Sequence, residues 1–161
     1  FKQKTAYEIM TCDWSSDVCS SDLIYAKPLP APHNAALTAP FWEAAKRHEL
    51  VMPRCKTCSN LFFYPRELCP HCLCGDLEWV SVSGKGRVYS FTVVHQPAHP
   101  SFSADAPHVF AIVQLDEGVR MPSNIVGCSI DDVHVDMRVS ATFDDVTPEV
   151  TLHKFRRRQG S

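Results

Sequence analysis

Hydrophobic, β-branched and aromatic residues recur in short segments through the second half of the chain, and turn-forming residues separate the segments. This pattern is typical of strands rather than helices. The expected strands cover residues 86–95, 108–115, 121–126, 138–143 and 150–155. Five strands in about seventy residues, without a long helix between them, predict a small closed or partly closed β-barrel.

A short amphipathic segment precedes these strands. One of its faces carries four residues at helical spacing: Phe41, Ala44, Ala45 and His48. Thr38 suits the N-cap position and Pro40 suits the first turn, so we expect a helix that begins near Thr38. A helix of about two to three turns is too short to be stable alone and must dock on its own domain or on a partner. Upstream, the Pro- and Ala-rich residues 24–36 predict an extended arm.

Two Cys-x-x-Cys pairs carry the strongest chemical signal. Cys55 and Cys58 form the first pair, and Cys69 and Cys72 form the second. Each pair offers two thiolates from one tight turn, and two such pairs close on a tetrahedral zinc or iron ion. Zinc is favoured because no glycine follows either pair, as it usually does in iron sites of the rubredoxin type. Four thiolates leave no open coordination position, which predicts a structural site; disulfides in a secreted protein are the competing interpretation.

The second pair leaves alternatives open. Cys74 follows so closely that Cys72 and Cys74 could supply the second pair, and His71 is a further candidate ligand. The Cys-x-x-Cys spacing favours Cys69 and Cys72. Cys128 stands alone in a strand-like context and is expected to be a small buried hydrophobe.

The composition of the whole chain is affected by its first segment. The chain has 161 residues, eight cysteines and a formal net charge of -2. Residues 1–23 follow neither a helical nor a strand period, and they match, in order and in frame, two translated pieces of a sequencing-library adapter. We expect this segment to be a disordered assembly artefact; a natural disordered arm is the alternative. The rest of the chain carries equal numbers of acidic and basic residues.

This balanced charge bears on the class of partner. A nucleic-acid-binding protein normally presents a basic groove to the phosphates, and here the basic residues gather only near the C-terminus, at Lys154 and Arg156 to Arg158. No apolar run approaches the roughly 20 residues that span a bilayer. We therefore expect a soluble, cytoplasmic protein for which nucleic acid is a poor partner.

The order of several motifs resembles a known family. Pro40 to Ala45, the two Cys-x-x-Cys pairs and Gly84 to His95 are similar to the acyl-CoA-associated OB-fold proteins with an N-terminal rubredoxin-like zinc ribbon, also called domain of unknown function thirty-five. The likeness covers residues 28–157. It implies a mainly β fold in four parts: an arm and helix at 24–49, a zinc ribbon at 50–78, a five-stranded OB barrel at 79–157 and a tail at 158–161. Leu73 and Cys74 are a departure from the family pattern, since glycine is expected after the second pair.

The resemblance also implies a function. It implies a non-catalytic subunit that pairs with a thiolase-like enzyme or an enoyl-CoA hydratase and holds or passes acyl-CoA in lipid, sterol or polyketide-like metabolism. No Ser/His/Asp or Cys/His arrangement is recognisable, so we expect no activity from this chain alone. Zinc is the expected structural cofactor and acyl-CoA the expected ligand. A single-stranded nucleic-acid-binding ribbon and barrel protein is the alternative.

Candidate contact residues lie in two regions. The loop between the first two expected barrel strands and the C-terminal basic cluster supply the candidates for ligand binding: His95, His99, Phe102, Arg156 and Arg157. Solvated loop and tail residues are the competing interpretation. In addition, five aromatic residues exceed what a short ribbon can bury, which predicts an apolar surface that faces a partner: Phe41, Trp42, Phe62, Phe63 and Tyr64.

Overall fold

The computed structural model describes residues 27–29, 35–97 and 99–158. The expected artefact at residues 1–23 lies outside the described residues, as do residues 24–26 and 30–34 of the expected arm and residues 159–161 of the tail. Within the described ranges, no helix is long and apolar enough to cross a membrane.

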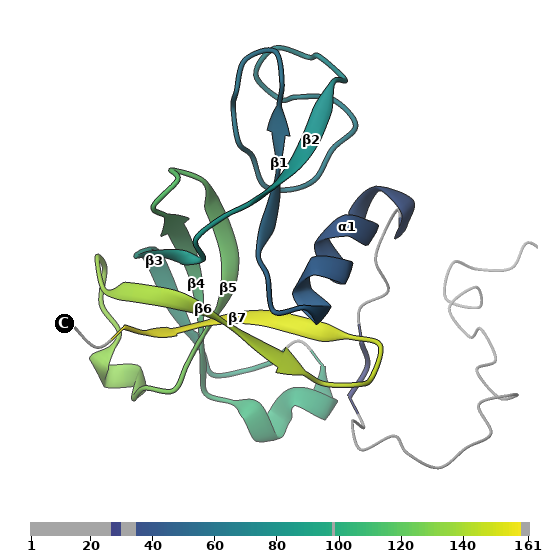
Figure 1. The fold of residues 1–161 in the computed structure, drawn as a ribbon. Coiled ribbons are helices and arrows are strands. Elements are labelled where there is room, and N and C mark those ends of the chain that lie inside the picture. The colour runs from purple at the N-terminus through teal and green to yellow at the C-terminus, as the bar shows by residue number, and fades with distance from the viewer. Residues whose placement is uncertain (1–26, 30–34, 98, 159–161) are drawn as a thin grey trace, which may run out of the picture.

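Over the described ranges the chain forms one α-helix, a small ribbon and a barrel (Figure 1). Helix α1 (Ala35–Lys46) comes first, and the antiparallel strands β1 (Val51–Cys55) and β2 (Leu77–Ser81) form the ribbon. The barrel strands are β3 (Lys85–Val94), β4 (His108–Leu115), β5 (Arg120–Val126), β6 (Arg138–Asp145) and β7 (Thr151–Arg157). Two 3-10 helices, η1 (Pro100–Asp105) and η2 (Ile130–Asp132), lie in the connections.

The five barrel strands close in the order β3-β4-β5-β7-β6. All neighbouring strands are antiparallel except β5 and β7, which run parallel. Closure depends on Gly86, which pairs with Leu115 on one side and with Val139 on the other. A Cβ atom at Gly86 would lie 2.4 Å from the carbonyl oxygen of Gln114, so only glycine fits there. The predicted fold class, mainly β with one helix, a cysteine ribbon and a five-stranded barrel, is confirmed.

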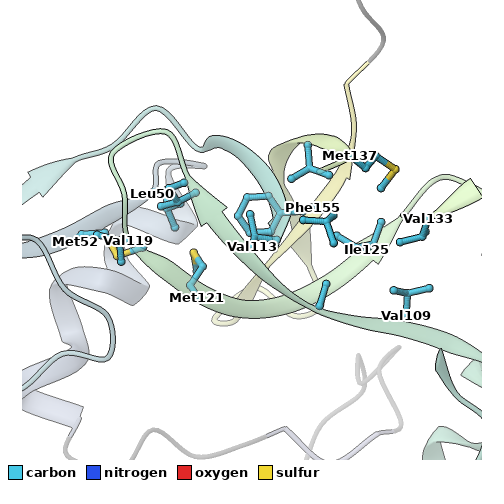
Figure 2. Packing of buried hydrophobic residues seen from close by; sticks show 14 of the residues in the cluster. Leu50, Met52, Val109, Val113, Val119, Met121, Ile125, Val133, Met137 and Phe155 are labelled. Carbon is cyan, nitrogen blue, oxygen red and sulfur yellow. The ribbon is translucent and has the colours of Figure 1, made fainter. Parts of the chain in front are cut away.

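The interior of the barrel is filled by alternate residues of its strands, as expected for a sheet with one buried face. On β4 the buried positions are Val109, Ala111, Val113 and Leu115. Val113, Ile125 and Phe155 belong to one cluster inside the curved strands (Figure 2). Leu50 and Met52, from the segment that leads into the ribbon, join the same cluster, so the ribbon base and the barrel share a core.

Helix α1 departs from its predicted bounds. It begins at Ala35 rather than near Thr38, and Pro40 lies inside it. Thr38, Phe41 and Ala45 are buried on one face, and this docking outweighs the local preferences of a cap and a proline. The placement of His48 on that face is wrong, because the helix ends at Lys46.

His48 instead fastens the end of the helix to the barrel. Its backbone is left-handed, with φ of 59°, and its ring stacks on Phe143 at 5.4 Å between centroids. Nε2 lies 3.0 and 3.1 Å from the carboxylate oxygens of Asp145, which also accepts a 2.6 Å hydrogen bond from Thr151 Oγ1. The Thr151 hydroxyl, and then His48, lower the pKa of the Asp145 carboxyl. The contact therefore joins α1 to both β6 and β7.

The aromatic surface predicted from the sequence is mostly internal. Phe41 and Phe62 are buried, at 5% and 6% exposure, so the prediction is wrong for these two residues. Trp42 and Phe63 are half-buried against the barrel cluster, and Tyr64 remains exposed. Phe41 is buried in the barrel cluster, whereas Phe62 is buried in the separate cluster of the ribbon.

Candidate metal centre

The two cysteine pairs lie in turns that have the same hydrogen bonds. In the first turn the Cys55 N–H donates to the Asn60 carbonyl at 3.0 Å, and the Ser59 N–H donates to the Cys55 carbonyl at 2.8 Å. In the second turn the N–H of Cys69 donates to Cys74, and the N–H of Leu73 donates to Cys69, both at 2.9 Å. The first knuckle sits at the far end of β1, away from the barrel (Figure 1).

This equivalence explains the unusual residues after the second pair. Ser59 and Leu73 occupy matching positions and both have a left-handed backbone, with φ of 57° and 61°. Glycine adopts this conformation most easily, which is why it is expected at these positions. Cys74 occupies the position that Asn60 holds in the first turn. Leu73 and Cys74 therefore leave the knuckle geometry unchanged.

Four sulfur atoms meet between the two turns. The Sγ atoms of Cys55, Cys58, Cys69 and Cys72 all lie within 4.8 Å of one another. The Cys55–Cys72 and Cys58–Cys69 distances are 3.5 and 3.6 Å. A zinc ion at the usual Zn–S distance of about 2.3 Å places tetrahedral sulfurs about 3.8 Å apart. The cluster therefore has the dimensions of a four-thiolate zinc site.

The pKa values of the four thiols shift in opposite directions, down at Cys55 and Cys69 and up at Cys58 and Cys72. The N–H of Cys58 lowers the pKa of Cys55 to about 6. At Cys72 the N–H of Cys74 also lowers the pKa, but lost hydration and the neighbouring Cys55 sulfur outweigh it and raise the pKa to about 12. Four thiolates at these distances repel one another, and a divalent cation between them removes that repulsion.

The two further donors considered from the sequence lie outside the sulfur cluster. The Sγ atom of Cys74 accepts hydrogen bonds from Thr57 Oγ1 at 3.1 Å and from the Asp76 N–H at 3.4 Å. His71 contributes its backbone N–H, which donates to Cys69 Sγ at 3.4 Å, and its side chain is exposed. The structure thus brings the Cys-x-x-Cys donors together and gives Cys74 a polar supporting position.

The candidate residues in the β3–β4 loop serve local structure. His99 Nδ1 accepts a 3.1 Å hydrogen bond from the Ser101 N–H and so caps η1. Its ring meets Phe102 edge on, with centroids 6.4 Å apart. Lys27 lies over the Phe102 ring at 5.7 Å and pairs with Asp105. This loop is therefore tied to residue 27 of the upstream arm.

The remaining candidates are exposed. His95 lies at the start of the loop, and Arg156 and Arg157 lie at the end of β7. Within the part of the chain that the structure describes, no hydrogen bond, ion pair or ring contact joins these arginines to His95, His99 or Phe102. The five ligand candidates thus fall into two separate groups.

Three cations near the arginines were missed by the sequence analysis: Lys85, Arg87 and Arg138. Arg138 lies on β6, which pairs with β7, and Lys85 and Arg87 lie on β3, which pairs with the other edge of β6 and is distant from β7 in sequence. Their only signal in the sequence is the alternation of basic residues along single strands, which gains meaning once the strand order is known.

A cysteine-bearing ribbon that leads into a closed five-stranded barrel defines the class of zinc-ribbon and OB-barrel proteins. Residues 42–78 match the family model described as "ChsH2, rubredoxin-like zinc ribbon domain", and residues 79–144 match "ChsH2, C-terminal OB-fold domain". The chain belongs to the DUF35/ChsH2 family, as the resemblance in the sequence predicted. The zinc-ribbon match and the four clustered cysteines support a structural zinc.

Several relatives have curated names. The chain is 43% identical over 117 residues to the probable enoyl-CoA hydratase alpha subunit of Thermomonospora curvata, a match that covers 72% of this chain and 36% of that protein. It is 42% identical over 104 residues to a DUF35 domain-containing scaffold protein of Methanocaldococcus jannaschii, a match that covers 63% of this chain and 73% of that protein. It is 31% identical over 93 residues to the benzoylsuccinyl-CoA thiolase subunit BbsA of Geobacter metallireducens, a match that covers 58% of this chain and 60% of that protein. The chain thus spans about a third of the hydratase subunit.

A solved structure shares the architecture. One chain of the structure described as "Ltp2-ChsH2(DUF35) aldolase" superimposes with a TM-score of 0.71 and 40% sequence identity. The match covers 80% of this chain and 98% of that chain. Ribbon and barrel therefore occur together as nearly the whole of that chain.

Proposed function

We propose that this chain is a non-catalytic accessory subunit that assembles with a hydratase or thiolase-like enzyme and holds or passes its acyl-CoA substrate. The observation that carries the proposal is the match to 98% of a chain in a structure whose description joins DUF35 to an aldolase. The relatives named as a hydratase subunit, a thiolase subunit and a scaffold protein support the same role. Each of the two enzyme names refers to a subunit of an enzyme whose substrate is a CoA ester.

We assign the structural zinc to Cys55, Cys58, Cys69 and Cys72. Four thiolates fill a tetrahedral zinc and leave no position for substrate or water, so the metal has no catalytic role. The ribbon depends on it, because the buried cluster of the ribbon consists of Cys55, Phe62 and Cys69. Two of these three residues are proposed ligands. Thiolates of this kind persist in a reducing compartment, which supports a cytoplasmic location.

The buried hydroxyl groups of Ser123 and Thr151 support a non-catalytic role. Ser123 Oγ donates to the His153 carbonyl at 3.2 Å, and Thr151 Oγ1 donates to Asp145. A nucleophilic hydroxyl needs a base, commonly histidine, within hydrogen-bond reach. Both hydroxyl groups instead satisfy structural acceptors between barrel strands and at the helix contact.

Assembly is the property to test. The chain is co-expressed with hydratase and thiolase-like proteins from the same genome, and each mixture is analysed by size-exclusion chromatography with light scattering. We expect one of them to elute with this chain as a complex of fixed stoichiometry. Separate elution of well-folded, zinc-loaded protein from every candidate would contradict the proposal.

A further inference from the structure

Five cations share one outer surface of the barrel, which we call the basic face: Lys85, Arg87, Arg138, Arg156 and Arg158. The register of β3, β6 and β7 brings them together. Arg87 of β3 lies directly opposite Arg138 of β6. Ser140 of β6 lies between Lys85 on the neighbouring β3 and Arg156 on the neighbouring β7. The Arg158 N–H donates to the Arg138 carbonyl at 2.9 Å, which extends the row past the end of β7. Directly opposed residues project from the same side of a sheet.

The cations of the basic face are exposed and have no acidic counterparts. All five side chains are exposed. Among the described residues, no carboxylate oxygen lies within 4.0 Å of their charged nitrogens, whereas Arg54, Lys56 and Lys154 are each paired with an acidic residue. The basic face therefore carries a local excess of positive charge, and its cations take part in no ion pair among the described residues.

The arrangement has an energetic cost when it stands alone. Like charges directly opposite one another on neighbouring strands destabilise a sheet. Arg87 and Arg138 form such a pair at the seam where the barrel closes. An anion bound between the two guanidinium groups offsets this repulsion and gains charge-assisted hydrogen bonds, frequently bidentate with a phosphate.

We propose that the basic face binds the phosphate groups of coenzyme A, the 3′-phospho-ADP end of an acyl-CoA. This inference rests on the proposed function and names the part of the chain that holds the ligand. Three strands at a spacing of about 4.8 Å, with side chains every second residue, give a charged area of about 10 by 7 Å. That area accommodates the clustered phosphates of one nucleotide. The phosphates remain at the hydrated surface, and the acyl group extends toward the partner enzyme.

The same surface is poorly suited to single-stranded nucleic acid. Proteins of that class combine a basic groove with aromatic rings on which bases stack. The exposed aromatic residue on these strands is Tyr89, and its ring is covered by the guanidinium of Arg120, 3.6 Å from the ring centroid. One face of the Tyr89 ring is thus taken by Arg120 and is not open to a base.

Neighbouring arginines provide a matched comparison. Arg156 pairs with Ser140 on the outer side, whereas Arg157 pairs with Val139, which is fully buried inside the barrel. The side chain of Arg157 therefore leaves β7 on the opposite side of the strand. It lies near Cys128, where burial raises the pKa of the thiol and the charge of Arg157 lowers it by a smaller amount. The proposal assigns Arg156 to the ligand and excludes Arg157, although both belong to one basic run in the sequence.

Titration calorimetry with the zinc-loaded full chain tests the proposal. The probes are CoA, 3′-dephospho-CoA, pantetheine and a single-stranded oligothymidylate, each at low and moderate salt. We expect CoA to bind more tightly than dephospho-CoA, pantetheine to show no binding, and added salt to weaken CoA binding. The double variant Arg87→Gln, Arg138→Gln should lose about tenfold or more in CoA affinity, because charged hydrogen bonds are lost. Arg157→Gln should bind as the unmodified chain does.

The outcomes separate this inference from the proposed function. Equal CoA affinity in all variants, with folding and zinc content intact, would overturn the basic face as the site and leave the acyl-CoA role standing. Absence of CoA binding by the unmodified chain would overturn both the site and the acyl-CoA part of the proposed function. Tighter binding of the oligothymidylate than of CoA, lost in the double variant, would overturn the proposal in favour of nucleic acid.

Discussion

The ring of Phe41 in α1 meets the ring of His153 in β7 edge on, with centroids 5.3 Å apart and planes at 88°. Phe41 is 5% exposed, so the contact is a buried link between the helix and the barrel. Within the described residues, His153 Nδ1 is buried and has no hydrogen-bond partner. Burial lowers the pKa of His153, and its hydrogen bond to the Pro122 carbonyl acts in the opposite direction. The environment of His153 therefore favours the neutral form of its ring.

This link predicts a loss of stability in mild acid. Below the ordinary pKa of 6.5, the unfolded chain takes up a proton at His153 that the folded chain resists. The free energy of unfolding should therefore fall as the pH drops below about 6.5 and level off below the lowered folded pKa. His153→Gln should flatten this part of the profile, and His95→Gln, at an exposed position, should retain it. Urea denaturation between pH 5 and 7.5 measures both; indistinguishable slopes for His153→Gln and the unmodified chain would refute the link.

The zinc assignment predicts different effects for neighbouring cysteines. Cys69→Ser should lose the metal and unfold the ribbon, because metal binding supplies most of the folding energy of such small units. Cys74→Ser should keep one zinc per chain, because its sulfur lies outside the cluster and only accepts hydrogen bonds from Thr57 and Asp76. Elemental analysis of the purified proteins gives the stoichiometry. Loss of zinc from Cys74→Ser, with Cys72→Ser still loaded, would show that the second pair has been assigned wrongly.

The close packing around Gly86, where β3 pairs with both β4 and β6, predicts that this position requires glycine. Gly86→Ala places a methyl group 2.4 Å from the Gln114 carbonyl oxygen, where the main chain has to move. We expect a loss of about 1–3 kcal/mol or more in the free energy of unfolding. Gly75→Ala is the matched control, because its new methyl group meets Leu68 at an ordinary 3.5 Å. Chemical denaturation compares the two; equal midpoints would mean that the seam is not as tight as described.

The barrel could be predicted from the sequence because its signal is local. Short β-branched and aromatic segments between turn residues identified all five strands, and the bounds of β4 agree residue for residue. The ribbon strand β1 was missed because Pro53 lies at its centre, and proline argues against a strand. The Pro53 carbonyl accepts a hydrogen bond from the Phe62 N–H at 3.2 Å, so Pro53 presents its carbonyl and nitrogen away from β2, and its missing N–H removes no bond between β1 and β2.

Features that depend on distant contacts could not be predicted. His48 is positioned by Phe143 and Asp145, which are almost a hundred residues away in sequence. The docking of α1 depends on Phe41, which lies in the barrel cluster, and no local cap rule includes such a contact. The cysteine cluster was found because each knuckle is a local turn with its own spacing, although its ligand assignment stays a prediction. The basic face needed the strand order β3–β6–β7 before Arg87 and Arg138 could be seen as neighbours.

The origin of residues 1–23 also stays a prediction. The described structure begins at residue 27 and does not bear on it. A chain that starts at residue 24 should bind zinc and CoA as the full chain does.

The central claim is that this chain acts as an accessory subunit. Turnover of acyl-CoA by the co-eluting hydratase or thiolase-like protein, measured with and without this chain, tests that claim most directly. The account predicts that this chain alone is inactive and that the partner gains activity or CoA affinity when this chain is added in stoichiometric amount. Turnover by this chain alone, or a partner whose activity and CoA affinity do not change on its addition, would contradict it.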